Sequence, residues 1–201
     1  MIVTKIEKIS SARSKVYINE KFAFVLYKGE LSEFHIKENS PLDEDQMNLI
    51  NEKLTKRAKL RAMHLLESMG RTEEQLRKKL QTSGYPDTAV EEAIRYVKSF
   101  GYINDDAYIY NFAESRKNKK SRREICASLM QKGLGADQIN RVLDEIYENH
   151  SERSAIEDII RKKRWDIENA DFKEKSKMEA YLVRKGFKYD DIKSAFSKSE
   201  F

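Results

Sequence analysis

One pattern of apolar residues and glycines occurs three times in this chain of 201 residues, and it constrains the fold more than any other feature. Segments 76–97, 125–146 and 178–199 align at constant shifts of 49 and 102 residues. Each places a glycine eight residues after its first apolar position, at Gly84, Gly133 and Gly186. Such periodicity is typical of repeat proteins, in which stacked units bury a continuous core.

The first copy shows what one unit looks like locally. Leu76 and Leu80 share one face of a predicted helix, and Gly84 suits the left-handed residue that ends a helix. A second helix follows, with an apolar stripe at helical spacing: Val90, Ala93, Ile94 and Val97. Each unit is therefore expected to contain a helix, a glycine turn and a further helix.

Capping signals mark where these helices begin. Thr72 with Gln75, and Ser121 with Glu124, have the spacing of a capping box. In the third copy, Ser176 and Glu179 have that spacing but lie two residues out of register. A further helical stretch precedes each pair, at about 57–69, 105–117 and 152–168. We therefore expect three helices in each unit.

The first 40 residues differ from the rest and are rich in β-forming side chains. Asn19, Glu20 and Lys21 resemble the turn of a hairpin between VYI and FAFVLY. Ser40 and Pro41 suit the N-cap and first position of a helix.

The predicted fold is mainly α: three tandem three-helix repeats after a short N-terminal β-hairpin-like segment. The predicted boundaries are 1–40 for this N-terminal segment, 41–56 for a connecting helix, and 57–103, 104–150 and 151–201 for the repeats.

Composition agrees with helices that carry solvated outer faces. Charged residues form 36% of the chain, and only 7 glycines and 2 prolines occur. The net charge of +5 favours an acidic partner, either nucleic acid or protein. One unpaired thiol, Cys126, and the lack of a signal peptide or membrane span predict a cytoplasmic protein.

Enzymatic signals are weak. Gly133 and Gly135 resemble the start of a dinucleotide loop, but no strand precedes them, so a helix cap is the better interpretation. The three histidines, His35, His64 and His150, lie far apart without ligand-spaced companions. The sequence predicts neither catalytic residues, nor a cofactor, nor a metal.

Two basic runs are the candidate binding residues. The first run, RKNKKSRR, falls at a predicted helix junction, where free amides of a helix N-terminus would add to its positive field. The second run precedes Trp165. For this ring, packing in the core or between repeats is a better interpretation than stacking on a base. A solvated loop is the alternative for the first. The candidates are Arg116, Lys117, Lys119, Lys120, Arg122, Arg123, Arg161, Lys162, Lys163 and Arg164.

Several stretches resemble the RecX family, small bacterial modulators of the RecA recombinase. They are GRTEEQLRKKL at 70–80, SGY at 83–85, FGYINDDAYIYNFAESR at 100–116, EICASLMQKGL at 124–134 and YLVRKGF at 181–187. Family members often have a glycine in the basic junction, where this chain has Lys119, Lys120 and Ser121.

The resemblance implies an elongated crescent of repeats that binds the RecA filament on single-stranded DNA. It also implies restraint of recombinase, ATPase and co-protease activity in DNA repair and the SOS response, without catalytic residues. We expect a monomer with weak direct DNA affinity and no membrane association. The alternative is a stand-alone helical protein that binds nucleic acid. The basic runs and the pI near 9.0 favour this alternative.

Overall fold

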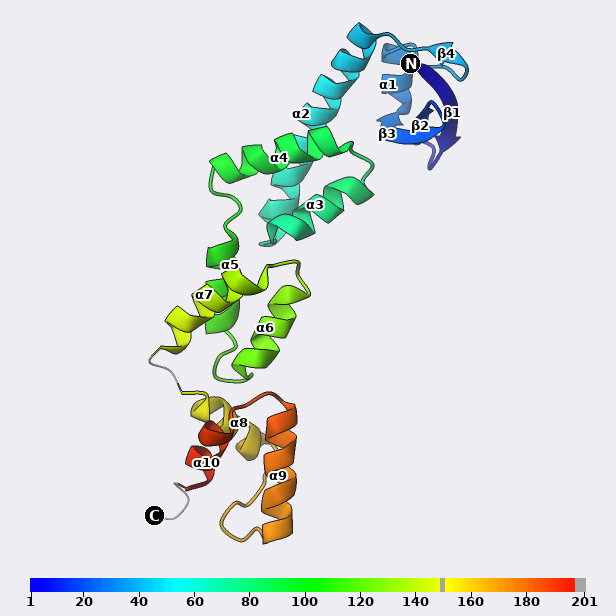
Figure 1. Ribbon diagram of the computed structural model, residues 1–201. Helices are drawn as coiled ribbons and strands as arrows, with labels where there is room; N and C mark the ends of the chain where they lie inside the picture. The colour runs from blue at the N-terminus through cyan, green and yellow to red at the C-terminus, as the bar shows by residue number, and fades with distance from the viewer. Residues whose placement is uncertain (149–150, 198–201) are drawn as a thin grey trace. The chain divides into compact units, whose positions relative to one another are not determined.

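The computed structural model describes residues 1–148 and 151–197, which form two compact units, Met1–Asn104 and Asp105–Phe201 (Figure 1). Unit 1 contains β1 (Ile2–Lys8), β2 (Arg13–Ile18), β3 (Lys21–Tyr27), α1 (Lys28–Glu33), β4 (Ser40–Pro41), α2 (Glu44–Ser68), α3 (Glu73–Thr82) and α4 (Asp87–Ser99). Unit 2 contains α5 (Asp105–Glu114), α6 (Arg122–Met130), α7 (Ala136–Tyr147), α8 (Arg153–Lys162), α9 (Phe172–Arg184) and α10 (Tyr189–Ser197). The mainly α class with an N-terminal β segment is confirmed.

The N-terminal segment forms an antiparallel sheet with strand order β3-β2-β1-β4. Its predicted hairpin is present between β2 and β3. Asn19 and Glu20 both have positive φ, 47° and 68°, as a two-residue hairpin turn requires. Lys21, which was expected in the turn, instead begins β3.

The prediction that Ser40 and Pro41 begin a helix is wrong. They form β4, in which Pro41 pairs with Ile2 at the sheet edge, where a residue without an N–H is tolerated. Helix α2 instead begins after Asp43, whose carboxylate accepts a hydrogen bond from the Gln46 amide at 2.7 Å. A carboxylate is as good a cap as a hydroxyl and adds a favourable charge at the helix start.

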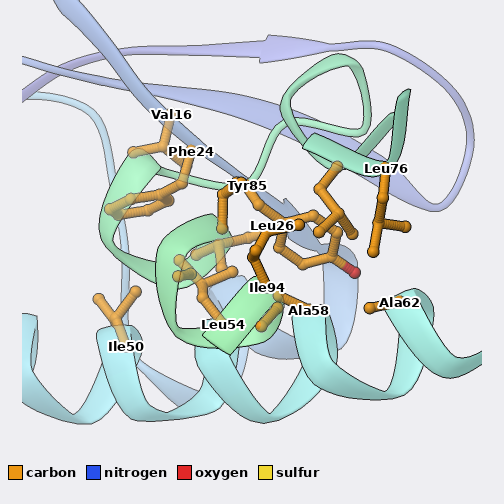
Figure 2. Packing of buried hydrophobic residues seen from close by; sticks show 14 of the residues in the cluster. Val16, Phe24, Leu26, Ile50, Leu54, Ala58, Ala62, Leu76, Tyr85 and Ile94 are labelled. Carbon is orange, nitrogen blue, oxygen red and sulfur yellow. The ribbon is translucent and has the colours of Figure 1, made fainter. Parts of the chain in front are cut away.

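Sheet and helices of unit 1 share one core (Figure 2). Phe24 and Leu26 of β3 are fully buried, as are Leu54 and Ala58 of α2. The predicted connecting helix and the first helix of repeat 1 form one continuous helix, α2. Its apolar face packs against both the sheet and the α3–α4 pair, so the small sheet is stabilised by the helices it contacts.

The three predicted glycine turns are confirmed. Gly84, Gly133 and Gly186 have φ of 86°, 86° and 91°. After α3, the Gly84 amide donates to the Gln81 carbonyl and the Tyr85 amide to the Leu80 carbonyl. This is the Schellman motif, and it recurs after α6 and α9.

In unit 1 the glycine turn also contacts the sheet. The Val25 amide of β3 donates to the Gly84 carbonyl at 3.0 Å. A Cβ atom at Gly84 would lie 2.2 Å from Cγ2 of Val25. Glycine is therefore required here twice, for the backbone conformation and for the close approach of β3.

Three helix ends in unit 2 differ from the prediction. Helix α5 ends at Glu114, not at residue 117, and residues 115–120 continue as turns. Helix α8 ends at Lys162, not at residue 168, because Arg164 adopts φ of 52° and the Trp165 amide closes a Schellman bond to the Ile160 carbonyl.

The third difference is the start of α9, which lies upstream of the predicted Ser176 and Glu179. Asp171 caps this helix and forms a full capping box with Glu174. The alternative cap has the same spacing, but it would leave the preceding residues of α9 outside the helix. The repeat boundaries 57–103, 104–150 and 151–201 stay predictions, and the last residues of the second and third lie outside the described residues.

A buried ion pair joins α1 to α2. Arg57 pairs with Glu30 and also donates to the Val25 carbonyl at 3.0 Å. Its guanidinium lies 4.6 Å from the ring centroid of Tyr27. Burial lowers the pKa of Arg57, but its interactions with Glu30 and Tyr85 together outweigh burial and raise the pKa overall.

The substitutions Gly84→Ala and Gly101→Ala distinguish two reasons for glycine in a turn, the positive φ and the lack of room for a Cβ atom. Both glycines have positive φ, but a Cβ at Gly101 meets nothing within 4 Å. We expect Gly101→Ala to lower the stability of unit 1 by about 1 kcal/mol, from backbone strain alone. Gly84→Ala should cost a further ~1–3 kcal/mol from overpacking against Val25. Native-state hydrogen exchange of the α2 amides measures both, and equal losses would contradict the contact with β3.

Removing one partner of the buried ion pair should be costly. Glu30→Ala leaves the Arg57 charge buried without a counter-charge, and we expect a loss of about 3 kcal/mol in the unfolding free energy of unit 1. Replacing both residues, as Glu30→Leu with Arg57→Met, should cost much less, because no buried charge remains. A loss below about 1 kcal/mol in Glu30→Ala would show that the pair behaves like an exposed one.

Candidate interaction surface

The first basic run, residues 116–123, connects α5 to α6 and is called the basic joint below. It lies at the junction of two helices, as the sequence predicted. Ser121 is the N-cap of α6, and its hydroxyl accepts a hydrogen bond from the Glu124 amide at 3.1 Å. Arg122 and Arg123 form the first turn of α6, and the other four basic residues precede the cap.

Half of the six positive charges in the basic joint have acidic partners. The three ion pairs are Lys117 with Glu114 at 2.7 Å, Lys120 with Glu124 at 2.8 Å and Arg122 with Asp144 at 2.8 Å. These partners lower the positive potential that the sequence alone suggests.

The remaining three cations of the basic joint have no ion pair in the part of the chain that the structure describes. Arg116 packs over Phe112, 3.9 Å from its ring centroid, and donates to the Phe112 carbonyl. Lys119 and Arg123 are exposed. These two side chains are therefore the cations of the basic joint best placed for a partner.

The start of α6 is not free to hold an anion, contrary to the expectation from sequence. The Arg122 amide donates to the Glu152 carboxylate at 2.6 Å. Glu152 is only 4% exposed. Because its carboxylate and the Ser121 hydroxyl accept hydrogen bonds from the Arg122 and Glu124 amides, these donors of the first turn already have partners within the chain.

The basic joint also holds the third repeat. The Ser121 hydroxyl donates to the Lys185 carbonyl at 2.6 Å. A Cβ at Gly186 would lie 2.9 Å from Cβ of Arg123. The glycine turn after α9 thus packs on the start of α6, as the turn after α3 packs on β3.

Two groups at this junction have pKa values raised by burial. Burial raises the pKa of Glu152, the nearby charge of Asp191 adds to the rise, and the hydrogen bond from the Arg122 amide opposes it. Burial likewise raises the pKa of the Tyr147 hydroxyl above its usual range. The junction is thus a poorly solvated place for charge.

The second basic run, residues 161–164, lies at the end of α8. Arg161 and Lys162 both pair with Asp158. Lys163 lies 4.3 Å from the ring centroid of Tyr181. Arg164 is exposed and has no acidic partner in the described ranges. Trp165 packs on Phe196, with ring centroids 5.4 Å apart, so its predicted core role is confirmed.

Neither a metal-binding cluster nor a membrane-spanning helix occurs in the part of the chain that the structure describes. Within residues 1–148 and 151–197, no three His, Cys, Asp or Glu side chains gather as they would around a metal ion. Among the same residues, no helix has the length and apolar character that crossing a membrane requires. Cys126 is half-buried against the core of the second repeat.

The fold and this surface define a helical repeat protein with basic residues exposed on unit 2, and known proteins agree on its class. Family models for the first and third three-helix domains of RecX match residues 58–96 and 151–196. Regulatory protein RecX of Caldanaerobacter subterraneus subsp. tengcongensis is 30% identical over 200 residues, which cover 98% of this chain and 99% of that protein. Regulatory protein RecX of Clostridioides difficile strain 630 is 26% identical over 204 residues, covering 98% and 95%. The chain belongs to the RecX family, a family of regulatory proteins.

Solved structures support the same assignment. A crystal structure of regulatory protein RecX aligns with a TM-score of 0.62 at 25% identity, covering 96% of this chain and 98% of that one. RecX from Lactobacillus salivarius aligns with a TM-score of 0.62 at 18% identity, covering 73% and 97%, and shows likeness of fold. The resemblance inferred from sequence is confirmed.

Sequence reasoning missed Glu152 at this surface. It follows Ser151 at an expected helix start, and its position predicts a role in α8 only. Its carboxylate instead caps α6, a helix that begins 30 residues earlier in the chain. A contact between residues 30 positions apart produces no local pattern by which a single sequence could reveal it.

Glu152→Gln should alter stability in a pH-dependent way. A carboxyl whose folded pKa is raised contributes stability that is fully present below its unfolded pKa and is lost as pH rises through the folded pKa. Glutamine keeps the acceptor for the Arg122 amide and resembles the protonated form. The free energy of unfolding of the variant should equal that of the wild type near pH 4 and exceed it by about 1 kcal/mol near pH 7. Thermal unfolding at both pH values measures this, and a difference that does not change with pH would contradict it.

Proposed function

We propose that this protein binds the RecA filament on single-stranded DNA and restrains its recombinase, ATPase and co-protease activities in DNA repair and the SOS response. Membership of the RecX family along nearly the whole chain is the observation that carries the proposal. The relatives are named regulatory proteins, and that name fits a chain that acts by occupying a partner's surface.

Within this proposal the protein has no catalytic step of its own. It is expected to work as a monomer in the cytoplasm, with weak direct affinity for DNA. Tandem repeats suit this mode of action because they offer a surface that one compact globule of this length does not. A filament likewise presents the same binding site on successive subunits.

The proposed contact residues are the cations of the two basic runs that neither form an ion pair nor pack over an aromatic ring in the described part of the chain. Lys119 and Arg123 in the basic joint and Arg164 after α8 are exposed and lack acidic partners among the described residues. Lys117, Lys120 and Arg122 contribute less, because their charges are already paired. Exposed charges at the edge of an interface act mainly on the rate at which the two partners associate.

A stand-alone nucleic-acid-binding protein is the second candidate. The pI near 9.0 favours it, and it requires tight binding to naked DNA with a steep salt dependence. Weak binding to naked DNA at about 0.15 M salt, beside strong inhibition of RecA, would exclude it.

The joint cations give the sharpest test. Lys119→Ala with Arg123→Ala should raise the concentration needed for half-inhibition of DNA-dependent RecA ATP hydrolysis by about tenfold, since two rim charges together contribute roughly 1.4 kcal/mol. Titration of wild type and variant against preformed filaments measures this shift.

A matched control removes two positive charges elsewhere in unit 2. Lys173→Ala with Lys175→Ala changes exposed α9 side chains that have no ion pair in the described part of the chain, and it should leave inhibition within about twofold of the wild type. Equal loss in both variants would show that net charge alone matters. Lack of inhibition by the wild type would overturn the proposed function itself.

A further inference from the structure

One end of the N-terminal sheet carries a basic pocket that the proposed function does not use. Its volume is about 370 Å³, and it lies where β1 turns into β2 and β3 runs into α1. Three basic side chains and three serines line it: Lys8, Arg13, Lys28, Ser10, Ser11 and Ser14. Apolar side chains of the sheet and α1 complete the lining, and no acidic residue is among them.

Strand pairing explains why these residues meet. Ile6 lies opposite Val16, and two residues further along the same strands Lys8 lies opposite Ser14. Because alternate residues of a strand share one face, Lys8 and Ser14 continue the face that buries Val16. The backbone bond from the Lys28 amide to the Ala12 carbonyl, 2.9 Å long, brings the start of α1 to the same end of the sheet.

The pocket's cations are not neutralised within the described part of the chain. Lys8, Arg13 and Lys28 form no ion pair among the residues that the structure describes, whereas Lys5, Arg77 and Lys98 of the same unit each pair with a glutamate. Ser14 is 6% exposed, and its hydroxyl has no hydrogen bond to any described residue. The Ser14 hydroxyl is therefore available to donate to an anion in the pocket, and an anion there would relieve the mutual repulsion of the three cations.

We infer that this pocket binds a phosphate group, and specifically a phosphodiester of a nucleic-acid backbone. A phosphate presents several acceptor oxygens in different directions, which matches cations and hydroxyls that come from three separate segments. Arginine offers a two-pronged donor and lysine a point charge, and hydroxyls and backbone amides are common phosphate donors. No aromatic ring that could stack on a base, and no Asn or Gln side chain, is among the lining residues, so we expect a contact with the backbone that depends little on nucleotide sequence.

Binding to naked single-stranded DNA tests the pocket without RecA, so its failure and that of the proposed function are distinguishable. Arg13→Ala with Lys28→Ala should weaken binding of a labelled oligo-dT by about tenfold at low salt. The slope of log K against log salt should also fall by about 1.4, since each lost cation contributes about 0.7 on a single strand. The control, Lys21→Ala with Lys37→Ala, removes two exposed charges of unit 1 that do not line the pocket, and should change affinity less than about twofold. Equal effects in the two double variants would overturn the inference.

A measurement on the wild type does not depend on any variant folding. Inorganic phosphate, compared with chloride at equal ionic strength, should shift the NMR amide signals of Ser10, Ser11, Arg13 and Lys28 more than those elsewhere in the sheet. Oligo-dT should shift the same signals. Shifts spread evenly over the surface would contradict a phosphate site. Shifts at the pocket with phosphate but not with oligo-dT would overturn the assignment to nucleic acid.

Discussion

The left-handed turn after the middle helix of each repeat is the constraint on which this structure depends. It ends the helix with a Schellman motif, and it lets a bare backbone approach the preceding element. Gly84 packs on Val25 of β3, and Gly186 packs on Arg123 of α6. The same kind of turn therefore makes two different contacts. In unit 1 it joins the helices to the sheet, and in unit 2 it joins the third repeat to the second.

Polar groups fix the geometry of these contacts. In unit 1, Arg57 and Glu30 hold α2 against α1 and β3, next to the turn that Gly84 makes. In unit 2, Ser121 and Glu152 cap α6, and the Ser121 hydroxyl also bonds the carbonyl that precedes Gly186. Directional bonds of this kind specify one arrangement, whereas apolar packing alone tolerates several. Much of the basic joint is therefore committed to structure, which leaves few cations for a partner.

Local patterns in the sequence predicted most of the fold. The spacing of Leu80 and Gly84 was enough to place a helix end, and Asn19 with Glu20 was enough to place a hairpin turn. Errors arose where two local choices were equally good, as with Ser40 and Asp43 as caps of α2. Tertiary pairing decided between them, because the β4 pairing with β1 removes Ser40 and Pro41 from the helix.

The candidate site was less predictable than the fold. The ten basic residues were visible as two runs, but their partners Asp144 and Glu152 lie tens of residues away in sequence. The basic pocket of unit 1 was not predicted at all, since its residues come from three segments that only the sheet brings together. Long-range pairing of this kind has no signature in a single sequence.

The basic joint and the basic pocket of unit 1 are the two surfaces proposed to contact a RecA filament and the DNA within it. Hydrogen–deuterium exchange of the full chain, with and without RecA filaments on single-stranded DNA, tests this most directly. We expect slower exchange on filament binding in residues 116–123 and in the β1–β2 loop, with little change in the buried faces of α2 and α7. Exchange that is unchanged throughout the chain in the presence of filaments would contradict it.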